Sequence, residues 1–283
     1  MKKIIIFDLD GTLFSSDKKI DQETIDKIID LERKGIQIGI ATGRFYNELD
    51  AIITQLRLRD FGGFVLSSNG LEVHEFLMNK TKIFLKMDSY QAKEMIELAH
   101  QFHLIPYVYE KNQYHMFYVY GFSSFQKIIR FLPSQFHYIK SIQELVLEKD
   151  VNLHSCLYDK ICFAGTHYHI QRFERYILKC FKNIKFYPVN SHCTELVKDE
   201  VGKLQACRYI CQTRNMTLDD VLFFGDSGND VDLLRECGCG VAMKNGMREA
   251  KKVADYISNF TNRHQGVLDM LNRFYPTKFD SIE

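Results

Sequence analysis

The sequence has no long hydrophobic run, almost no excess charge of either sign and no Cys-x-x-Cys pair. None of its apolar runs approaches the length needed to span a bilayer, so we expect no membrane partner. Only four apolar residues follow Met1-Lys2-Lys3, too few for a signal peptide, and we expect a cytoplasmic protein. The 37 basic and 36 acidic residues leave a formal net charge of +1, which argues against nucleic acid as the main partner.

The eight cysteines all lie in the second half of the chain. Cys207 and Cys211 stand four apart in a helical pattern, and Cys237 and Cys239 flank one glycine. A zinc site would need two further ligands at suitable spacing. The pattern therefore favours buried, reduced thiols in a cytosolic protein.

Two acidic motifs are present near opposite ends of the chain. Residues 8–12 read Asp-Leu-Asp-Gly-Thr after the apolar run 4–7, and residues 225–230 read Gly-Asp-Ser-Gly-Asn-Asp after the run 221–224. Such runs are typical of strands buried on both faces of a parallel sheet. Carboxylates at buried strand ends need a cation or hydrogen-bond donors. The carboxyl edge of such a sheet binds ligands, and Mg²⁺ suits carboxylate oxygens.

Before residue 83 and after residue 190 the chain reads as alternating strands and helices, which predicts an α/β fold with a parallel sheet. Helical spacing of apolar residues and terminating glycines mark the helices. The expected strands are 3–7, 36–41, 64–66, 221–225, 240–243 and 254–258, and the expected helices are 22–34, 49–56, 201–213, 230–236 and 246–253.

The middle of the chain differs, with short strands, clustered aromatics and few glycines. Residues 106–109 and 114–120 predict a β-hairpin, with helical patterns at 89–103, 123–132 and 168–182. At 283 residues the chain is long for one domain. We expect a first domain of residues 1–82 and 191–283, interrupted by an inserted α+β domain of residues 83–190.

Asp8 and Asp10 are close enough to divide the work of a reaction. One carboxylate can act as a nucleophile and the other as a general acid and then a base. A carboxylate nucleophile suits phosphoryl transfer, because an aspartyl phosphate replaces one difficult displacement by two easier ones. The alternative interpretation is a capping acid at a strand–loop junction.

Three further positions carry both a functional and a structural interpretation. Thr42 could hold a phosphoryl oxygen together with backbone N–H groups, or could cap the following helix. Lys203 could neutralise a nucleophile and a phosphoryl group, or could be a solvated helix lysine. Asp226 and Asp230 could bind a metal, or could form an acidic loop with a helix cap.

Four motifs in this order resemble those of the haloacid dehalogenase superfamily. They are Asp8-x-Asp10-Gly11-Thr12, Thr42-Gly43-Arg44, Lys203 and Gly225-Asp226-x-x-Asn229-Asp230. The position and mixed α+β pattern of the insert resemble the C2B type of cap. Residues 68–70 (Ser-Asn-Gly) and 241–245 resemble the Cof-type phosphatases. The resemblance implies a Rossmann-like three-layer core with an inserted α+β cap that determines substrate specificity.

The resemblance also implies roles for the matching residues. Asp8 would be the nucleophile and a Mg²⁺ ligand, and Asp10 the acid/base, with its backbone carbonyl on the metal. Asp226 and Asp230 would complete the metal site, while Thr42 and Lys203 would hold the phosphoryl group. The remaining substrate- and phosphate-binding candidates are Leu9, Gly43, Asn69, Asn229 and Asn245.

The sequence therefore predicts a Mg²⁺-dependent phosphatase that hydrolyses small phosphorylated metabolites through an aspartyl phosphate. A hexose phosphomutase would use the same acids and return the phosphoryl group to the sugar. A phosphosugar-binding regulator would not need Asp10. The dehalogenase and phosphonate hydrolase chemistries of the superfamily fit less well, because Asp10 suits an alkoxide leaving group. Sugar phosphates, pyridoxal phosphate and flavin mononucleotide all remain open as substrates, as does the oligomeric state.

Overall fold

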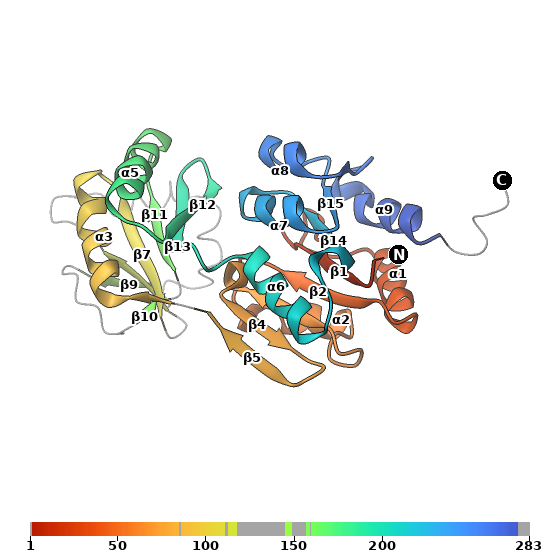
Figure 1. The fold of residues 1–283 in the computed structure, drawn as a ribbon. Coiled ribbons are helices and arrows are strands. Elements are labelled where there is room, and N and C mark those ends of the chain that lie inside the picture. The colour runs from red at the N-terminus through yellow and green to blue at the C-terminus, as the bar shows by residue number, and fades with distance from the viewer. Residues whose placement is uncertain are drawn as a thin grey trace. The chain divides into compact units, whose positions relative to one another are not determined.

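A computed structural model describes residues 2–84, 86–110, 113–117, 145–148, 157–158 and 160–276 of the chain (Figure 1). The chain forms two compact units. The first consists of residues 1–84 and 201–283, and the second of residues 85–200.

An eight-stranded sheet forms the centre of the first unit, in the order β16-β15-β14-β1-β2-β3-β4-β5. The six strands from β16 to β3 run parallel, and β4 and β5 continue the sheet as an antiparallel hairpin. The strands are β1 (Ile4–Phe7), β2 (Gln37–Ala41), β3 (Phe64–Ser67), β4 (Glu72–Glu75), β5 (Lys80–Ile83), β14 (Val221–Gly225), β15 (Cys239–Ala242) and β16 (Tyr256–Ile257).

Helices cover both faces of this sheet, because side chains of each central strand alternate between them. Ile5 and Phe7 of β1 pack in a core with α1 (Gln22–Arg33), α2 (Asp50–Gln55) and α9 (Gly266–Phe274). Ile4 and Ile6 pack in a second core with α6 (Lys203–Thr213), α7 (Val231–Glu236) and α8 (Arg248–Val253). The result is a three-layer α/β sandwich whose central strands are buried on both faces.

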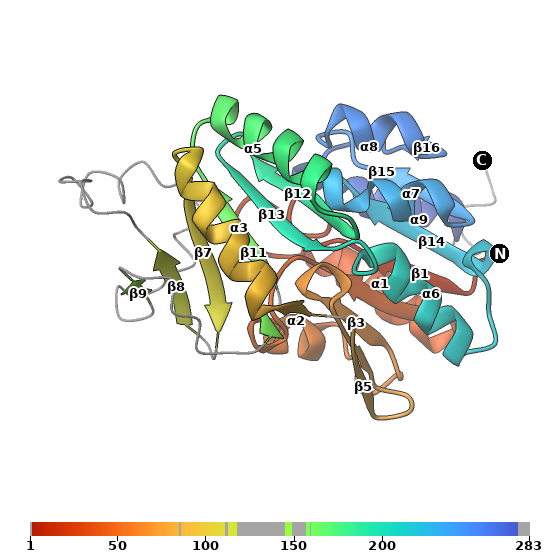
Figure 2. The same cartoon turned by 60° about the vertical axis from the view of Figure 1, so that its left-hand side comes forward.

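The second unit has a six-stranded sheet in the order β12-β13-β11-β7-β8-β9, in which only β8 and β9 pair in parallel. Figure 2 shows α3 (Ser89–Gln101) and α5 (His167–Cys180) lying over it, and their apolar side chains share one core with β7, β11 and β13. The strands of this unit are β6 (Met87–Asp88), β7 (Ile105–Glu110), β8 (Gln113–Phe117), β9 (Leu145–Glu148), β10 (Leu157–Tyr158), β11 (Ile161–Ala164), β12 (Ile184–Asn190) and β13 (Cys193–Lys198).

The second unit ends later in the chain than the expected boundary at residues 190 and 191. The reason is that β13 pairs with β11 and β12 and so extends the second sheet to Lys198. The first boundary, between residues 84 and 85, lies two residues beyond the expected one.

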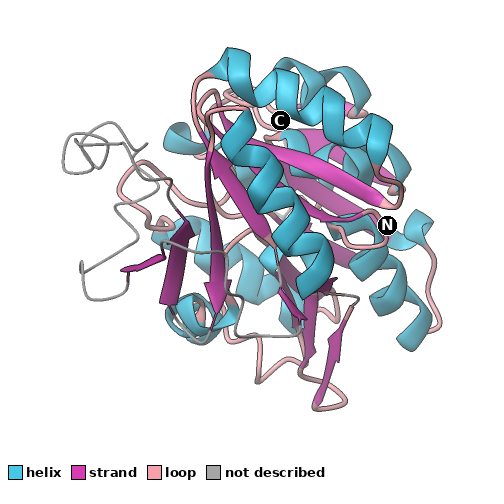
Figure 3. Cartoon of the chain, turned by 90° about the vertical axis from the view of Figure 1, so that its left-hand side faces the viewer, coloured by secondary structure: helices cyan, strands magenta, loops and turns pink. Residues whose placement is uncertain are grey.

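The α/β alternation of the first unit agrees with the sequence prediction, and Figure 3 shows helices and strands in both units. In the first unit, strands β4 and β5 and helix α9 were not predicted. The predicted hairpin of the second unit exists as β7 and β8, while residues 118–120 and the helical pattern at 123–132 lie outside the described residues. Among the helices of the described chain, none combines the length and the apolar character needed to cross a membrane.

Candidate active site

Two neighbouring strands carry acidic residues at their carboxyl ends. Strands β1 and β14 pair in parallel with Phe7 opposite Phe224, and the backbone N–H of Asp8 donates to the Phe224 carbonyl at 2.9 Å. Asp8 directly follows β1, and Asp226 directly follows β14. The sheet therefore brings together two carboxylates that are more than 200 positions apart in the sequence.

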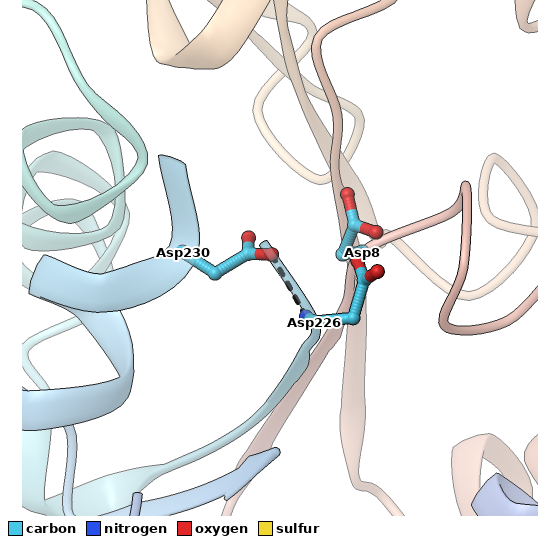
Figure 4. A group of neighbouring side chains, drawn as sticks. All are labelled: Asp8, Asp226 and Asp230. Atoms are coloured by element: carbon cyan, nitrogen blue, oxygen red, sulfur yellow. Dashed lines mark hydrogen bonds between the residues drawn. The ribbon is translucent and has the colours of Figure 1, made fainter. Parts of the chain in front are cut away.

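Asp230 completes a cluster of three carboxylates (Figure 4). Its Oδ2 accepts hydrogen bonds from the backbone N–H groups of Asp226, at 2.9 Å, and Ser227, at 3.0 Å. These bonds fix the carboxylate at the turn before α7. One oxygen from each of Asp8, Asp226 and Asp230 lies within 4.8 Å of the others, a spacing that allows shared coordination of one cation.

Lys203 lies at the first position of α6, and its side chain is fully buried. Its Nζ donates to Oδ1 of Asp8 at 2.7 Å and to Oδ1 of Asp230 at 2.6 Å. The close approach of two backbone segments sets this position, because a Cβ on Gly70 would lie 2.4 Å from the Gly202 carbonyl oxygen. The interpretation of Lys203 as a solvated lysine is therefore wrong.

Burial and mutual repulsion dominate the electrostatics of the cluster. Burial raises the pKa of Asp8 to about 7, although Lys203 opposes the shift. Burial, followed by the charges of Asp8 and Asp230, raises the pKa of Asp226 to about 9. The pKa of Lys203 is also raised, because the two carboxylates outweigh its burial. Three carboxylates facing one ammonium thus favour an additional cation.

The Asp8 carboxylate has one oxygen in use and one open. Oδ1 accepts from Lys203, whereas Oδ2 is buried and has no hydrogen-bond partner among the described residues. A buried carboxylate oxygen without a partner is costly in a folded protein. The open oxygen therefore indicates a position for a ligand.

The turn after Asp8 is held from several directions. Gly11 has a φ of +88°, and a Cβ at this position would lie 2.3 Å from Oδ2 of Asp226, so the turn requires glycine. Nδ2 of Asn245 donates to the Gly11 carbonyl at 2.7 Å, and Nδ2 of Asn262 donates to the Phe14 carbonyl at 2.7 Å. Asn245 thus braces the turn with its side chain.

Asp10, at the same turn, is half exposed and faces Arg44. Nε of Arg44 donates to Oδ2 of Asp10 at 2.7 Å, and Nη2 donates to Oδ1 at 2.6 Å. The motif Thr42-Gly43-Arg44 indicated this arginine, but sequence reasoning assigned it no role.

Thr42 follows β2, the other neighbour of β1, and is buried. Its Oγ1 accepts from the backbone N–H of Arg44 at 3.2 Å, and the cap of the next helical turn is Phe45, so Thr42 does not cap that turn. Asn69 follows β3 with a φ of +58°, and its Oδ1 accepts from Nδ2 of Asn229 at 2.7 Å. Thr42, Asn69 and Asn229 thus lie at the same sheet edge as Asp8.

Leu9 and Gly43 also lie close to these groups, but neither offers a side chain to a ligand. The side chain of Leu9 is completely buried in the core with α1, so only its backbone remains for a ligand. Gly43 lies against Asn69, because a Cβ at this position would be 3.1 Å from the Asn69 Oδ1.

The chain matches the family model of the haloacid dehalogenase-like hydrolases over residues 5–271. It therefore belongs to this family, as the motifs predicted.

Relatives along the whole length include the phosphatase YwpJ of Bacillus subtilis, which is 24% identical over 95% of this chain and 98% of its own. The HMP-PP phosphatase of Klebsiella pneumoniae is 25% identical over 97% of this chain and 96% of its own. A haloacid dehalogenase-like hydrolase from Bacteroides thetaiotaomicron matches the fold with a TM-score of 0.78 at 24% identity, covering 97% of this chain and 100% of that one. These findings confirm the predicted fold and a phosphatase of the haloacid dehalogenase type.

Proposed function

We propose that this protein is a Mg²⁺-dependent phosphatase that hydrolyses small phosphomonoesters, such as sugar phosphates, through an aspartyl phosphate on Asp8. The observation that carries the proposal is the Asp8 carboxylate, buried between Lys203 and the acidic cluster with one oxygen open. A nucleophile needs such an open oxygen.

The residues at the cluster fit a hard divalent cation. Three carboxylates within coordination distance of one another and a single ammonium leave excess negative charge in a buried place. Asp8, Asp226 and Asp230 would hold Mg²⁺ with the Asp10 backbone carbonyl, and the bound ion would supply charge neutralisation for the phosphoryl oxygens.

In the first step, an oxygen of Asp8 attacks phosphorus in line, and the bond from phosphorus to the ester oxygen breaks. Asp10 gives its proton to that oxygen, so the leaving group departs as an alcohol. In the second step, Asp10 takes a proton from water, which attacks phosphorus and releases inorganic phosphate and the free Asp8 carboxylate. Catalysis of this kind consists mostly of positioning and charge stabilisation.

The other residues at the edge of the sheet bind the phosphoryl group or support the loops around it in this scheme. Lys203 reduces the repulsion between Asp8 and the substrate dianion, and the Thr42 hydroxyl with the backbone of Leu9 and Gly43 donates to phosphoryl oxygens. Asn69 and Asn229 hold the loops after β3 and β14 together. Asn245 supports the Gly11 turn from outside.

The second unit acts as the cap that selects the substrate, in a cytoplasmic enzyme. Two relatives support a small phosphorylated metabolite as the substrate. One is the HMP-PP phosphatase, and the other is a sugar phosphatase of known structure with 19% identity and a TM-score of 0.77, which covers 96% of this chain and 98% of its own.

Phosphate release from a panel of phosphomonoesters, with and without Mg²⁺, tests the proposal. We expect Mg²⁺-dependent release that falls by at least about a thousandfold in Asp8→Asn, because the nucleophile is lost. Asp232→Asn is the matched control, since Asp232 lies in the first turn of α7 and pairs with Arg235 at the surface. Turnover of Asp8→Asn near that of wild type would overturn the covalent mechanism. Isomerised sugar phosphate without free phosphate would identify a mutase.

A further inference from the structure

The Asp10 carboxylate and the Arg44 guanidinium form a two-point ion pair. The two donor nitrogens, Nε and Nη2, each reach a different oxygen of Asp10, at 2.7 and 2.6 Å. This geometry fixes the plane of a carboxylate as well as its position, which a single bond does not do. The Arg44 side chain is 14% exposed and that of Asp10 is 50% exposed, so the arginine is the more firmly packed partner.

Arg44 is itself held by its surroundings. Its Cζ lies 5.0 Å from the centre of the Phe14 ring, within the range of a cation–π contact. Its backbone N–H donates to Thr42 Oγ1, and its carbonyl accepts from the N–H of Ser68 at 2.8 Å. Phe14 belongs to the same turn as Asp10, and the two residues form a β-bridge. The arginine therefore joins the loop after β2 to the turn after β1.

We propose that Arg44 is the positioning residue for the acid Asp10. The inference rests on the proposed phosphatase function. In the protonated acid, one oxygen carries the proton and faces the ester oxygen, while the other still accepts from Arg44. When the proton has moved to the leaving oxygen and the bond from phosphorus has broken, both carboxylate oxygens accept from Arg44 again. The guanidinium keeps its own protons throughout.

A positioned acid matters in proportion to how much the leaving group needs a proton. An alkoxide is a poor leaving group and depends on protonation, whereas p-nitrophenolate leaves as a stable anion. Loss of the positioning residue should therefore slow hydrolysis of an alkyl phosphate far more than that of p-nitrophenyl phosphate. A purely structural role, or direct binding of the phosphoryl group, would reduce both rates equally.

The experiment compares kcat/KM for glycerol 2-phosphate and p-nitrophenyl phosphate in saturating Mg²⁺, because kcat/KM reports the first chemical step. The variants are Arg44→Gln, Arg44→Lys and Asp10→Asn. Arg59→Gln is the matched control, since Arg59 also pairs with an aspartate, Asp50, and packs over an aromatic ring, Phe76. Circular dichroism verifies that each variant folds. If Arg44→Gln does not fold, Arg44→Lys replaces it in the comparison of the two substrates.

We expect Arg44→Gln to lower kcat/KM about 30- to 100-fold for glycerol 2-phosphate and less than about threefold for p-nitrophenyl phosphate, the pattern of a weakened general acid. Asp10→Asn should show the same selectivity more strongly, and Arg59→Gln should show neither loss. Equal losses on both substrates, or no loss, in Arg44→Gln would overturn the role of Arg44. If Asp10→Asn is unselective too while wild type releases phosphate, Asp10 is not the acid and only this inference falls, whereas wild type that releases no phosphate overturns the proposed function as well.

Discussion

The ammonium of Lys203 and the carboxylate of Asp8 form a buried hydrogen bond of 2.7 Å between residues 195 positions apart. The bond engages only Oδ1 of Asp8, and the same ammonium also donates to Oδ1 of Asp230 at 2.6 Å. Lys203 therefore orients Asp8 without covering its second oxygen. The same contact that stabilises the buried charges leaves the second Asp8 oxygen open for the nucleophilic role that we propose.

Replacing Lys203 by methionine tests both the orientation of Asp8 for reaction and the stabilisation of the buried charges, because each has its own measurement. We expect Lys203→Met to lower kcat by at least about a hundredfold, because a preorganised charge at the reacting group is lost. We also expect the free energy of unfolding to fall by about 3–5 kcal/mol without metal, since two buried carboxylates lose their partner. Phosphate release and urea unfolding measure the two quantities.

The control for this variant is Lys34→Met, which removes an exposed lysine that pairs with Asp30 at the end of α1. It should change neither quantity by much. If Lys203→Met keeps its activity while losing stability, Lys203 has a structural role only.

Metal affinity should depend on pH. The raised pKa values of Asp8, about 7, and Asp226, about 9, mean that both carboxyls hold protons in the metal-free fold at pH values where they are ionised when unfolded. Their contribution to stability is therefore complete below the ordinary pKa of 3.8 and is lost as the pH rises through 7 and 9. Mg²⁺ binds the ionised forms and must displace these protons.

We therefore expect the Mg²⁺ affinity to rise from pH 6 to pH 9, by up to about tenfold per pH unit for each proton released. Titration calorimetry in two buffers of different ionisation enthalpy gives both the affinity and the number of protons. Asp226→Asn should bind Mg²⁺ weakly at every pH, whereas Asp232→Asn should behave as wild type. An affinity that stays constant over this range would contradict the assignment of these carboxylates as ligands.

The parts of the fold that follow a simple periodicity were predictable from the sequence. Strands β1 and β14 are apolar throughout because both faces of the sheet are covered, and this pattern also located Asp8 and Asp226. The β4–β5 hairpin was missed because its strands are short and polar, and every residue of β5 is exposed. Strand β13 was assigned to the wrong domain because the expected boundary fell in the short turn between β12 and β13, which pair in one sheet.

The site could be predicted only as far as its motifs reach. The position of Asp8 beside Asp226 follows from parallel strand ends, but local sequence favours a solvated Lys203. Its burial depends on α6 approaching the loop after β3, a contact between segments more than 130 positions apart. The pairing of Arg44 with Asp10 likewise depends on two loops that meet only in the folded sheet.

Glu32, near the end of α1, has a buried carboxyl without a hydrogen-bond partner among the described residues. Both of its oxygens are buried and lack hydrogen bonds within the described parts of the chain. Burial raises its pKa from the ordinary 4.5 to about 8, with Arg57 opposing the shift. A raised carboxyl pKa contributes stability that is complete below pH 4.5 and is lost as the pH rises towards 8.

Glu32→Gln should therefore stabilise the protein at high pH and not at low pH. Glutamine carries no charge to bury, and we expect the free energy of unfolding of this variant at pH 9 to exceed that of wild type by roughly 1–3 kcal/mol, because wild type must then hold an ionised carboxylate without a partner. At pH 5 the difference should be small, because Glu32 is then largely protonated in the fold. Urea unfolding of the two proteins at pH 5, 7 and 9 measures this, with the exposed Glu249→Gln as control. A difference between Glu32→Gln and wild type that is the same at all three pH values would show that Glu32 stays ionised and is compensated in the fold.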